Sequence, residues 1–237
     1  MRTNLPNILT VLNLLCGCMA IVCVLDNDFQ LAFVLIFIGG MADYFDGMVA
    51  RLLNVHSPFG KELDSLADMV SFGVFPAMIL YVLLRTHGGP MIGPLHLIGV
   101  PAFLLAGFAC IRLAKFNLDT RQAYDFIGMP TPSCTLFIVG LMLIHHHDSF
   151  GLGQTITSPY ILYPVIAIFS YLLVSEIRMF SFKFKSKKWK GNEDRIVFLI
   201  LGVVLLIFLR EVAFSLMILL YVIYAIYGRL VKGGIGD

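Results

Sequence analysis

Eight long apolar stretches constrain the fold of this chain more than any other feature of its sequence. They cover roughly residues 8–25, 31–53, 63–84, 92–115, 131–147, 159–180, 195–210 and 213–231. A helix needs about 20 mostly apolar residues to cross the hydrocarbon core of a bilayer. Hydrophobic residues make up 59% of the 237 residues and charged residues 14%, which is typical of a membrane protein. We therefore predict an all-α polytopic membrane protein whose connections are too short to hold a soluble domain.

The basic residues gather on one side of these stretches. If the connection after the second stretch is cytoplasmic, only Arg85 and Arg210 fall on the opposite side. The basic residues on or near the cytoplasmic side are Arg2, Arg51, Lys61, Arg112, Lys115, Arg121, Arg178, Lys183, Lys185, Lys187, Lys188, Lys190, Arg195, Arg229 and Lys232. Cytoplasmic loops of membrane proteins carry such an excess of Lys and Arg. We expect a multi-pass protein of a plasma (inner) membrane with both termini in the cytoplasm.

The segment 178–195 interleaves aromatic residues with lysines. This pattern is typical of segments at a membrane surface, and the lysines are expected to bind anionic lipid head groups. The partners that we expect are therefore membrane lipids and small substrates, and no nucleic acid.

Residues 43–68 concentrate acidic side chains in this otherwise apolar chain. They read D-Y-F-D-G-M-V-A-R-L-L-N-V-H-S-P-F-G-K-E-L-D-S-L-A-D. Helical spacing places one set on one face of the second stretch: Asp43, Asp46, Gly47, Ala50 and Arg51. Gly60, Asp64 and Asp68 follow at steps of four, again on one helical face. Two helices that each offer two carboxylates can form one metal site lined by oxygen atoms.

Acidic residues inside a membrane are costly and mark functional sites by default. Four carboxylates would repel one another in a pocket of low dielectric constant, and a hard divalent cation such as Mg²⁺, Mn²⁺ or Ca²⁺ would resolve this repulsion. Two such cations can clamp the oxygens of a diphosphate. The small residues Gly47 and Ala50 would let a ligand lie against the helix backbone, and Arg51 could hold a phosphate in a bidentate manner. The segment thus indicates diphosphate chemistry at a membrane surface.

The spacing D-x2-D-G-x2-A-R-x8-G-x3-D-x3-D resembles the signature of the CDP-alcohol phosphotransferase family at every fixed position. The resemblance implies a core of six membrane helices, a site for divalent metal (two ions of Mg²⁺ or Mn²⁺) at its cytoplasmic end, and a homodimer. It also implies transfer of a phosphatidyl or related group from a CDP-linked donor to an alcohol, with release of CMP. By the same resemblance, Asp43, Asp46 and Asp64 are metal ligands, and Asp68 is both a ligand and the general base. Gly47, Ala50, Arg51 and Gly60 then frame the CDP group.

Three further stretches are similar to the phosphatidylserine synthase branch of that family, which uses CDP-diacylglycerol and L-serine. They are P-N-I-L-T-V-L-N-L-L-C-G near the start, R-L-A-K-F-N at 112–117 and F-I-G-M-P-T-P-S at 126–133. Arg112, Lys115 and Ser133 are the expected ligands of the acceptor or of a phosphate. Lys115 also suits a simple anchor at the membrane surface, and Ser133 suits a cap of the fifth helix.

These observations divide the chain into three parts. Residues 1–180 are the predicted six-helix core, residues 181–194 a basic cytoplasmic loop, and residues 195–237 an additional pair of helices without an assigned catalytic role. Two other functions stay open. The acceptor could be another alcohol, such as glycerol 3-phosphate or inositol phosphate. The acids could instead line a cation or proton transporter, although transporters place polar breaks near the middle of the bilayer.

Overall fold

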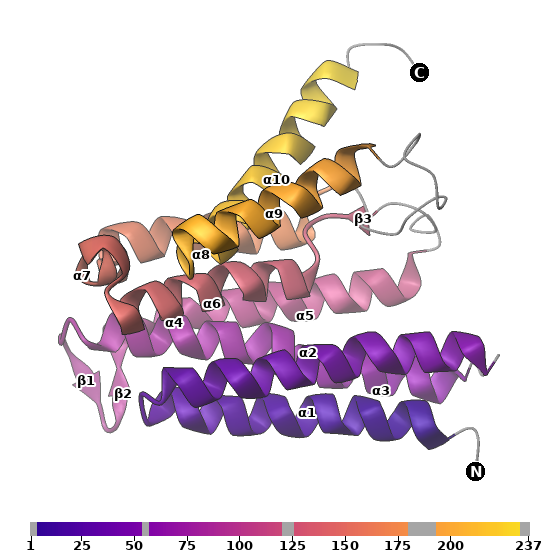
Figure 1. Cartoon of the computed structure of the whole chain (residues 1–237). Helices are drawn as coiled ribbons and strands as arrows, with labels where there is room; N and C mark the ends of the chain where they lie inside the picture. Colours follow the sequence, from indigo (N-terminus) through magenta and orange to yellow (C-terminus); the bar gives the residue numbers. More distant parts are fainter. Residues whose placement is uncertain (1–3, 54–56, 120–125, 180–192, 233–237) are drawn as a thin grey trace.

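The structure, a computed structural model, describes residues 4–53, 57–119, 126–179 and 193–232, and most of them are helical (Figure 1). The long helices run roughly alongside one another and form a bundle. The helices up to the central connection are α1 (Asn4–Leu25), α2 (Phe29–Leu52), α3 (Pro58–Asp68), the π-helical segment η1 (Met69–Val74), α4 (Phe75–Arg85), the 3-10 segment η2 (Leu97–Ala102) and α5 (Phe103–Leu118). The later ones are α6 (Thr131–His147), the 3-10 turn η3 (Ser149–Gly151), α7 (Gly153–Thr157), α8 (Pro159–Val174), α9 (Glu193–Leu209) and α10 (Val212–Lys232).

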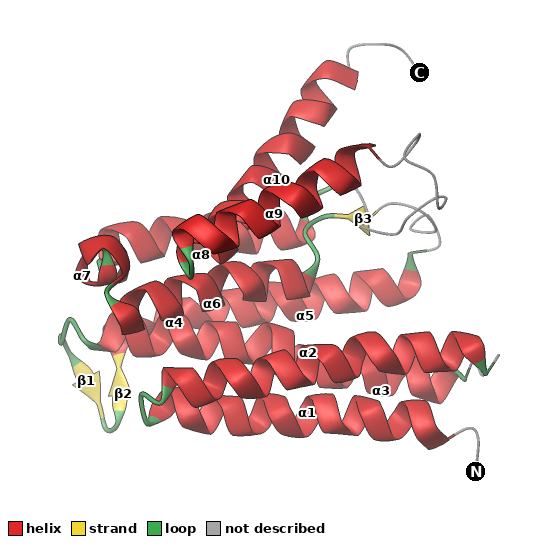
Figure 2. Ribbon diagram, viewed as in Figure 1, coloured by secondary structure: helices red, strands yellow, loops and turns green. Residues whose placement is uncertain are grey.

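Strands are restricted to two short antiparallel pairs in the described residues (Figure 2). β1 (Met91–Ile92) pairs with β2 (Leu95–His96), and β3 (Phe126–Ile127) pairs with β4 (Arg178–Met179). The two pairs lie at opposite ends of the bundle (Figure 1). The start of α1, the end of α2, the start of α3 and β3 share one end of the bundle (Figure 1).

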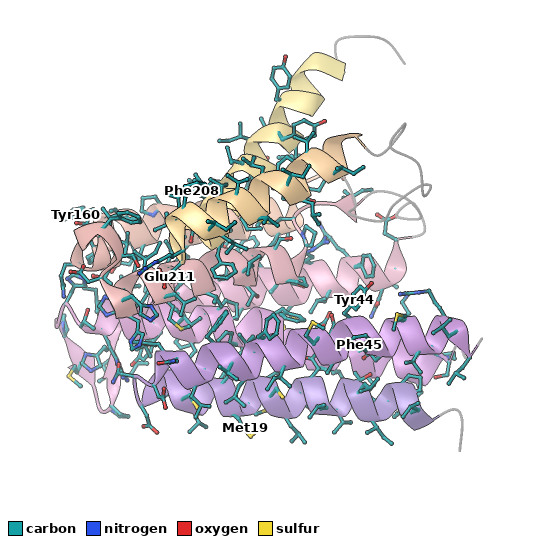
Figure 3. All side chains as sticks on the ribbon, in the orientation of Figure 1. Met19, Tyr44, Phe45, Tyr160, Phe208 and Glu211 are labelled. Atoms are coloured by element: carbon teal, nitrogen blue, oxygen red, sulfur yellow. The ribbon has the colours of Figure 1, made fainter. Side chains whose placement is uncertain are left out.

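Each of the eight predicted apolar stretches contains helix in the structure, and the all-α prediction is confirmed. Four helices of the described residues are long and apolar enough to cross a membrane: Leu5–Leu25, Phe29–Leu52, Pro58–Arg85 and Leu97–Leu118. Shorter apolar helices are Pro159–Val174, Ile196–Leu209 and Val212–Tyr227. Exposed apolar side chains such as Met19, Tyr160 and Phe208 point away from the bundle, as expected of a surface that faces lipid (Figure 3).

Two predicted boundaries were wrong. The fourth stretch was expected from residue 92, but residues 91–96 form the β1–β2 hairpin around Gly93, whose φ of +58° suits a tight turn. The sixth was expected to reach residue 180, but α8 ends at Val174. Ser175 is extended, and the chain beyond it pairs as β4 with β3. The polar residues Ser175, Glu176 and Arg178 and the backbone pairing with β3 thus end the helix earlier than we expected.

The helix that carries Asp64 and Asp68 continues into the centre of the bundle. In its most apolar window, 67% of the residues of Pro58–Arg85 are buried, against 28–33% in the other three long apolar helices. Leu80, Leu83 and Leu84 of α4 are fully buried. The acidic end of this helix is therefore attached to the most enclosed element of the fold, which restricts its movement.

The π-helical segment η1 begins directly after Asp68. π-Helical turns are rare and often lie at functional sites. Two hydroxyl groups contact neighbouring helices here. Thr135 Oγ1 of α6 lies 3.1 Å from the main-chain oxygen of Phe72 and 3.0 Å from that of Thr131, and Ser71 of η1 donates to the main-chain oxygen of Asn13 in α1 at 3.1 Å. The local change of helical register after Asp68 is thus fixed from both sides.

The additional C-terminal helices pack on the core through α10. Ser215 of α10 donates a hydrogen bond to the main-chain oxygen of Phe137 in α6 at 2.9 Å. Gly140 of α6 allows this close approach, because a Cβ atom there would meet the side chain and backbone of Ser215. Further along, α10 projects away from the bundle towards the C-terminus (Figure 1). The basic residues of the predicted loop 181–194 lie outside the described residues, and its last two residues begin α9.

Candidate metal and diphosphate site

Three of the four signature aspartates meet between α2 and α3. Asp43, Asp64 and Asp68 each offer a carboxylate oxygen, and these atoms all lie within 4.8 Å of one another. All three side chains are half-buried. α1 packs against both helices and so holds α2 and α3 close enough for these acids to converge.

The start of α3 is defined by local capping. Ser57 accepts a hydrogen bond from the backbone N–H of Gly60 at 2.9 Å and so caps α3, with Pro58 in the first turn. Gly60 itself is tightly enclosed: a Cβ atom there would lie 3.0 Å from Ser57 Oγ and 3.3 Å from Asn7 Oδ1. The requirement for a small residue at this position therefore has a packing cause, in addition to the framing of CDP that we predicted.

Asp46 lies one turn along α2 from Asp43 and has a different environment. Its side chain is buried, and its Oδ2 accepts a hydrogen bond of 2.6 Å from Thr10 Oγ1 in α1. Asp46 does not belong to the group of three acids whose oxygens lie within 4.8 Å. The structure therefore brings Asp43, Asp64 and Asp68 together and holds Asp46 beside them through α1.

Sequence reasoning missed the contribution of α1 to this site. Asn13 is fully buried, and its Nδ2 lies 3.3 Å from Asp68 Oδ1. The signal was present in the sequence, because Asn7, Thr10 and Asn13 recur every three residues in an otherwise apolar stretch. It could not be connected to the aspartates before the packing of α1 against α2 and α3 was known.

The face of α2 after Asp46 carries the residues expected to frame the CDP group. Arg51 is exposed and folds back over Gly47, where a Cβ atom would lie 3.3 Å from Arg51 Nη1. Ala50, which lies between Gly47 and Arg51 in the sequence, is half-buried. The guanidinium group therefore lies over a stretch of helix backbone without a large side chain, about one helical turn from the acids.

The predicted acceptor residues lie in different settings. Arg112 of α5 is buried, and its Nη1 donates to the main-chain oxygen of Ile127 at 2.9 Å, which ties α5 to β3. Lys115 is exposed. Ser133 is half-buried in the first turn of α6. The alternative that Ser133 caps this helix was wrong, because α6 begins at Thr131 and Pro130 occupies the cap position without a side-chain hydrogen bond.

The end of α5 is attached to the aspartate helix. Lys61 Nζ donates to the main-chain oxygen of Asn117 at 2.7 Å, and Asn117 Nδ2 donates to Ser65 Oγ at 2.9 Å. Ser65 is the neighbour of Asp64 in α3. The C-terminal end of α5, which carries Lys115 and which we predicted to be cytoplasmic, therefore lies along the same part of α3 as the acids.

The donor set at this site fits a hard divalent cation. All three grouped ligands are carboxylates, the oxygen ligands that Mg²⁺ and Mn²⁺ prefer. The Oδ1 atom of Asp64 is buried without a hydrogen-bond partner. A buried carboxylate oxygen without a partner is costly, and a bound cation would remove this cost.

The family model for CDP-alcohol phosphatidyltransferase matches residues 3–174 of this chain. The chain belongs to the CDP-alcohol phosphatidyltransferase family. The match ends where α8 ends, and α9 and α10 lie beyond it.

Several relatives carry the name CDP-diacylglycerol–serine O-phosphatidyltransferase. The Bacillus subtilis protein is 37% identical over 180 residues, which is 76% of this chain and 91% of that protein. The Helicobacter pylori protein is 34% identical over 224 residues, 93% of this chain and 89% of its own length. The Methanocaldococcus jannaschii protein is 34% identical over 227 residues, 95% of this chain and 92% of its own length. The last two similarities extend well beyond residue 174, so they include residues of the C-terminal helix pair.

Proposed function

We propose that this chain is an enzyme that transfers the phosphatidyl group of CDP-diacylglycerol to L-serine, giving phosphatidylserine and CMP. The observation that carries the proposal is the group of Asp43, Asp64 and Asp68 within 4.8 Å, formed by residues of the family's signature. The names of relatives that match 76–95% of this chain support serine as the acceptor.

Asp43, Asp46, Asp64 and Asp68 would hold two divalent ions, Mg²⁺ or Mn²⁺. Such ions, when bound, neutralise the diphosphate and stabilise the charge on the departing CMP. Asp43, Asp64 and Asp68 converge directly, whereas Asp46 is aligned by the hydrogen bond from Thr10. The protein contributes a carboxylate set that is already assembled, because α1 packs against both α2 and α3 and bonds to Asp46 and Asp68.

Asp68 is the proposed general base. As the serine oxygen forms a bond to the phosphorus that bears diacylglycerol, its hydroxyl proton passes to the Asp68 carboxylate. The bond between that phosphorus and the bridging oxygen of the diphosphate breaks, and its electron pair leaves with CMP. General-base assistance of this kind contributes about 10²- to 10⁴-fold to a rate. Asp68 is the last residue of α3 and the acid nearest in sequence to the buried α4. It therefore lies next to an enclosed part of the bundle.

The donor would lie along the open face of α2. Gly47 and Ala50 leave room for the nucleotide against the backbone, and Gly60 keeps the start of α3 close to α1. Arg51 would hold a phosphate oxygen pair, which its planar guanidinium group suits. The exposed position of Arg51 over Gly47 supports this role, because a ligand could displace the guanidinium group from the glycine and then bind it.

Arg112, Lys115 and Ser133 are the proposed acceptor residues. A guanidinium group has five N–H donors, and the bond to Ile127 uses one of them. Arg112 could therefore join the segment 126–129 to the carboxylate of serine. Lys115, on the exposed side of α5, would attract the anionic substrates, and Ser133 would offer a hydroxyl group from the start of α6.

The proposed setting is a plasma (inner) membrane, with both termini and the active site in the cytoplasm. The excess of basic residues on the side that holds the aspartates supports this orientation. We further propose a homodimer, as implied by the family resemblance. Light scattering of the purified protein in detergent measures its mass and tests the dimer directly.

The test of the proposed function is release of CMP from CDP-diacylglycerol by the purified chain, with Mg²⁺ or Mn²⁺. The acceptors to compare are L-serine, glycerol 3-phosphate and inositol phosphate. Release that depends on serine, with phosphatidylserine as the lipid product, is expected. Release with another alcohol alone would reassign the acceptor. No release with any alcohol, in a folded protein with metal, would refute the enzyme and return the transporter to consideration.

A further inference from the structure

The helix α1 lines the aspartate site with a row of polar side chains. Asn7, Thr10 and Asn13 lie three residues apart, so they share one face of α1. Asn7 Oδ1 lies close to Gly60, and Thr10 bonds to Asp46. Asn13 reaches Asp68, the residue to which the proposed function gives the proton.

Asn13 is enclosed on all sides by the bundle. Its relative exposure is 0%, and it lies in the first half of an apolar helix. One side of its amide faces Asp68, with Nδ2 3.3 Å from Asp68 Oδ1. The other side faces α2, where a Cβ atom on Gly39 would come within 3.2 Å of Asn13 Oδ1. Gly39 is one helical turn before Asp43, so the amide is inserted where the two aspartate helices and α1 meet.

This insertion is unfavourable for stability taken alone. The Oδ1 atom of Asn13 is buried without a hydrogen-bond partner. A buried acceptor without a partner costs about 1–3 kcal/mol. An apolar side chain at this position of an apolar helix would avoid that cost. The amide is therefore better explained by what it does to Asp68 than by packing.

We propose that Asn13 is a positioning residue for Asp68, an inference that rests on the proposed function. Its N–H donates to one carboxylate oxygen of Asp68 and so leaves the other oxygen to accept the proton of the alcohol. The main chain of Asn13 contributes as well, because its oxygen accepts the hydrogen bond from Ser71, three residues after Asp68. Side chain and main chain of one residue thus hold both Asp68 and the π-helical turn that follows it. Gly39 provides the space that the amide needs.

The experiment compares Asn13→Ala and Asn13→Leu with the control Cys16→Ala in the full-length protein. Leucine is close to asparagine in size, adds no charge and lacks the N–H donor, so Asn13→Leu decides the matter if Asn13→Ala does not fold. Cys16 is buried one turn further along α1, and its Cβ also lies against Gly39. Cys16→Ala keeps that Cβ atom and removes only the buried sulfur atom, so the control perturbs the same region of α1 without touching Asp68.

Four quantities are measured for each variant: kcat for CMP release, KM for each substrate, affinity for Mn²⁺ by electron paramagnetic resonance, and the melting temperature. We expect kcat of both Asn13 variants to fall by about 10- to 100-fold, the loss that follows from a misplaced catalytic group. KM, Mn²⁺ affinity and melting temperature should stay close to those of Cys16→Ala.

Three results would overturn this role. A kcat equal to that of the control would leave Asn13 with a packing role only. A loss of Mn²⁺ affinity as large as the loss of kcat would make the amide oxygen a metal ligand. A melting temperature that falls with kcat would make the effect structural.

If serine proves to be the wrong acceptor, the same comparison is made with the alcohol that releases CMP, because any alcohol must lose its proton. If the wild-type protein releases no CMP with any alcohol, the proposed function and this inference both fail.

Discussion

Thr10→Val is the substitution whose effect the structure defines best. Thr10 Oγ1 lies 2.6 Å from Asp46 Oδ2 and 3.1 Å from the main-chain oxygen of Pro6. A hydroxyl group has one proton to donate, so the shorter contact to the carboxylate takes it. Both side chains are buried, at 3% and 6% relative exposure. Valine keeps the shape of threonine but leaves the Asp46 oxygen without this donor.

The magnitude follows from the burial of that bond. A hydrogen bond to a charged group contributes about 1.5–3 kcal/mol net. We therefore expect Thr10→Val to lower the free energy of unfolding of the metal-free protein by about 1.5–3 kcal/mol, because water does not replace the lost donor at a buried carboxylate. Since Asp46 also loses its alignment, kcat/KM for CDP-diacylglycerol should fall by about tenfold or more, given that 1.4 kcal/mol corresponds to a factor of ten.

Two assays are needed on the purified protein in mixed micelles. Denaturation measures the free energy of unfolding, and CMP release from the folded protein measures kcat/KM. Thr10→Ser is the matched control, since it loses a methyl group but keeps the hydroxyl group. A second comparison places Thr10→Val in an Asp46→Ala background, where the substitution should cost much less because the partner is gone. Equal stability of Thr10→Val and Thr10→Ser would refute the reasoning, and so would an undiminished cost of Thr10→Val in the absence of the Asp46 carboxylate.

Four further substitutions test the assigned roles. Asp68→Asn should abolish CMP release but leave binding of CDP-diacylglycerol nearly intact, because an amide still offers an oxygen to metal but cannot accept the proton. Asp64→Asn should weaken Mn²⁺ binding as well. Near-normal turnover in both variants would contradict the assignment. Gly47→Leu should block donor binding, measured by titration of a folded variant, because the side chain would fill the space under the guanidinium group of α2; unchanged affinity would indicate a role in helix packing. Arg112→Lys should raise KM for serine more than KM for CDP-diacylglycerol, because lysine cannot hold the Ile127 oxygen and a carboxylate in one plane; a larger effect on the donor would move this residue to the phosphate.

Much of the local structure could be predicted from the sequence. Helical periodicity relates residues that are three or four apart, so it placed Asp43 with Asp46 and Asp64 with Asp68 before any packing was known. The length and apolar content of each stretch predicted its helix, since a chain in lipid must satisfy its backbone hydrogen bonds within each segment. The short connection between the second and third stretches was enough to suggest that their acidic faces meet.

The sequence left out the features that depend on contacts between distant segments. Nothing local to residues 4–25 indicated that Thr10 and Asn13 would reach the aspartates, because this depends on the rotation of α1 against α2 and α3. The early end of α8 follows from pairing of β3 with β4, more than 50 residues apart in the chain. The π-helical turn after Asp68 likewise depends on contacts with other helices, through the hydroxyl groups of Ser71, which faces α1, and of Thr135 in α6.

The division has a physical cause. Periodicity, length and capping act within about one or two helical turns, so the sequence by itself determined which helices form and which of their faces carry carboxylates. Side-chain contacts between helices depend on how the faces pack, and many packings satisfy the same apolar pattern. Only the tertiary structure decided that Asp43, Asp64 and Asp68 converge while Asp46 is held by α1, because small residues such as Gly39 and Gly60 let these particular faces approach.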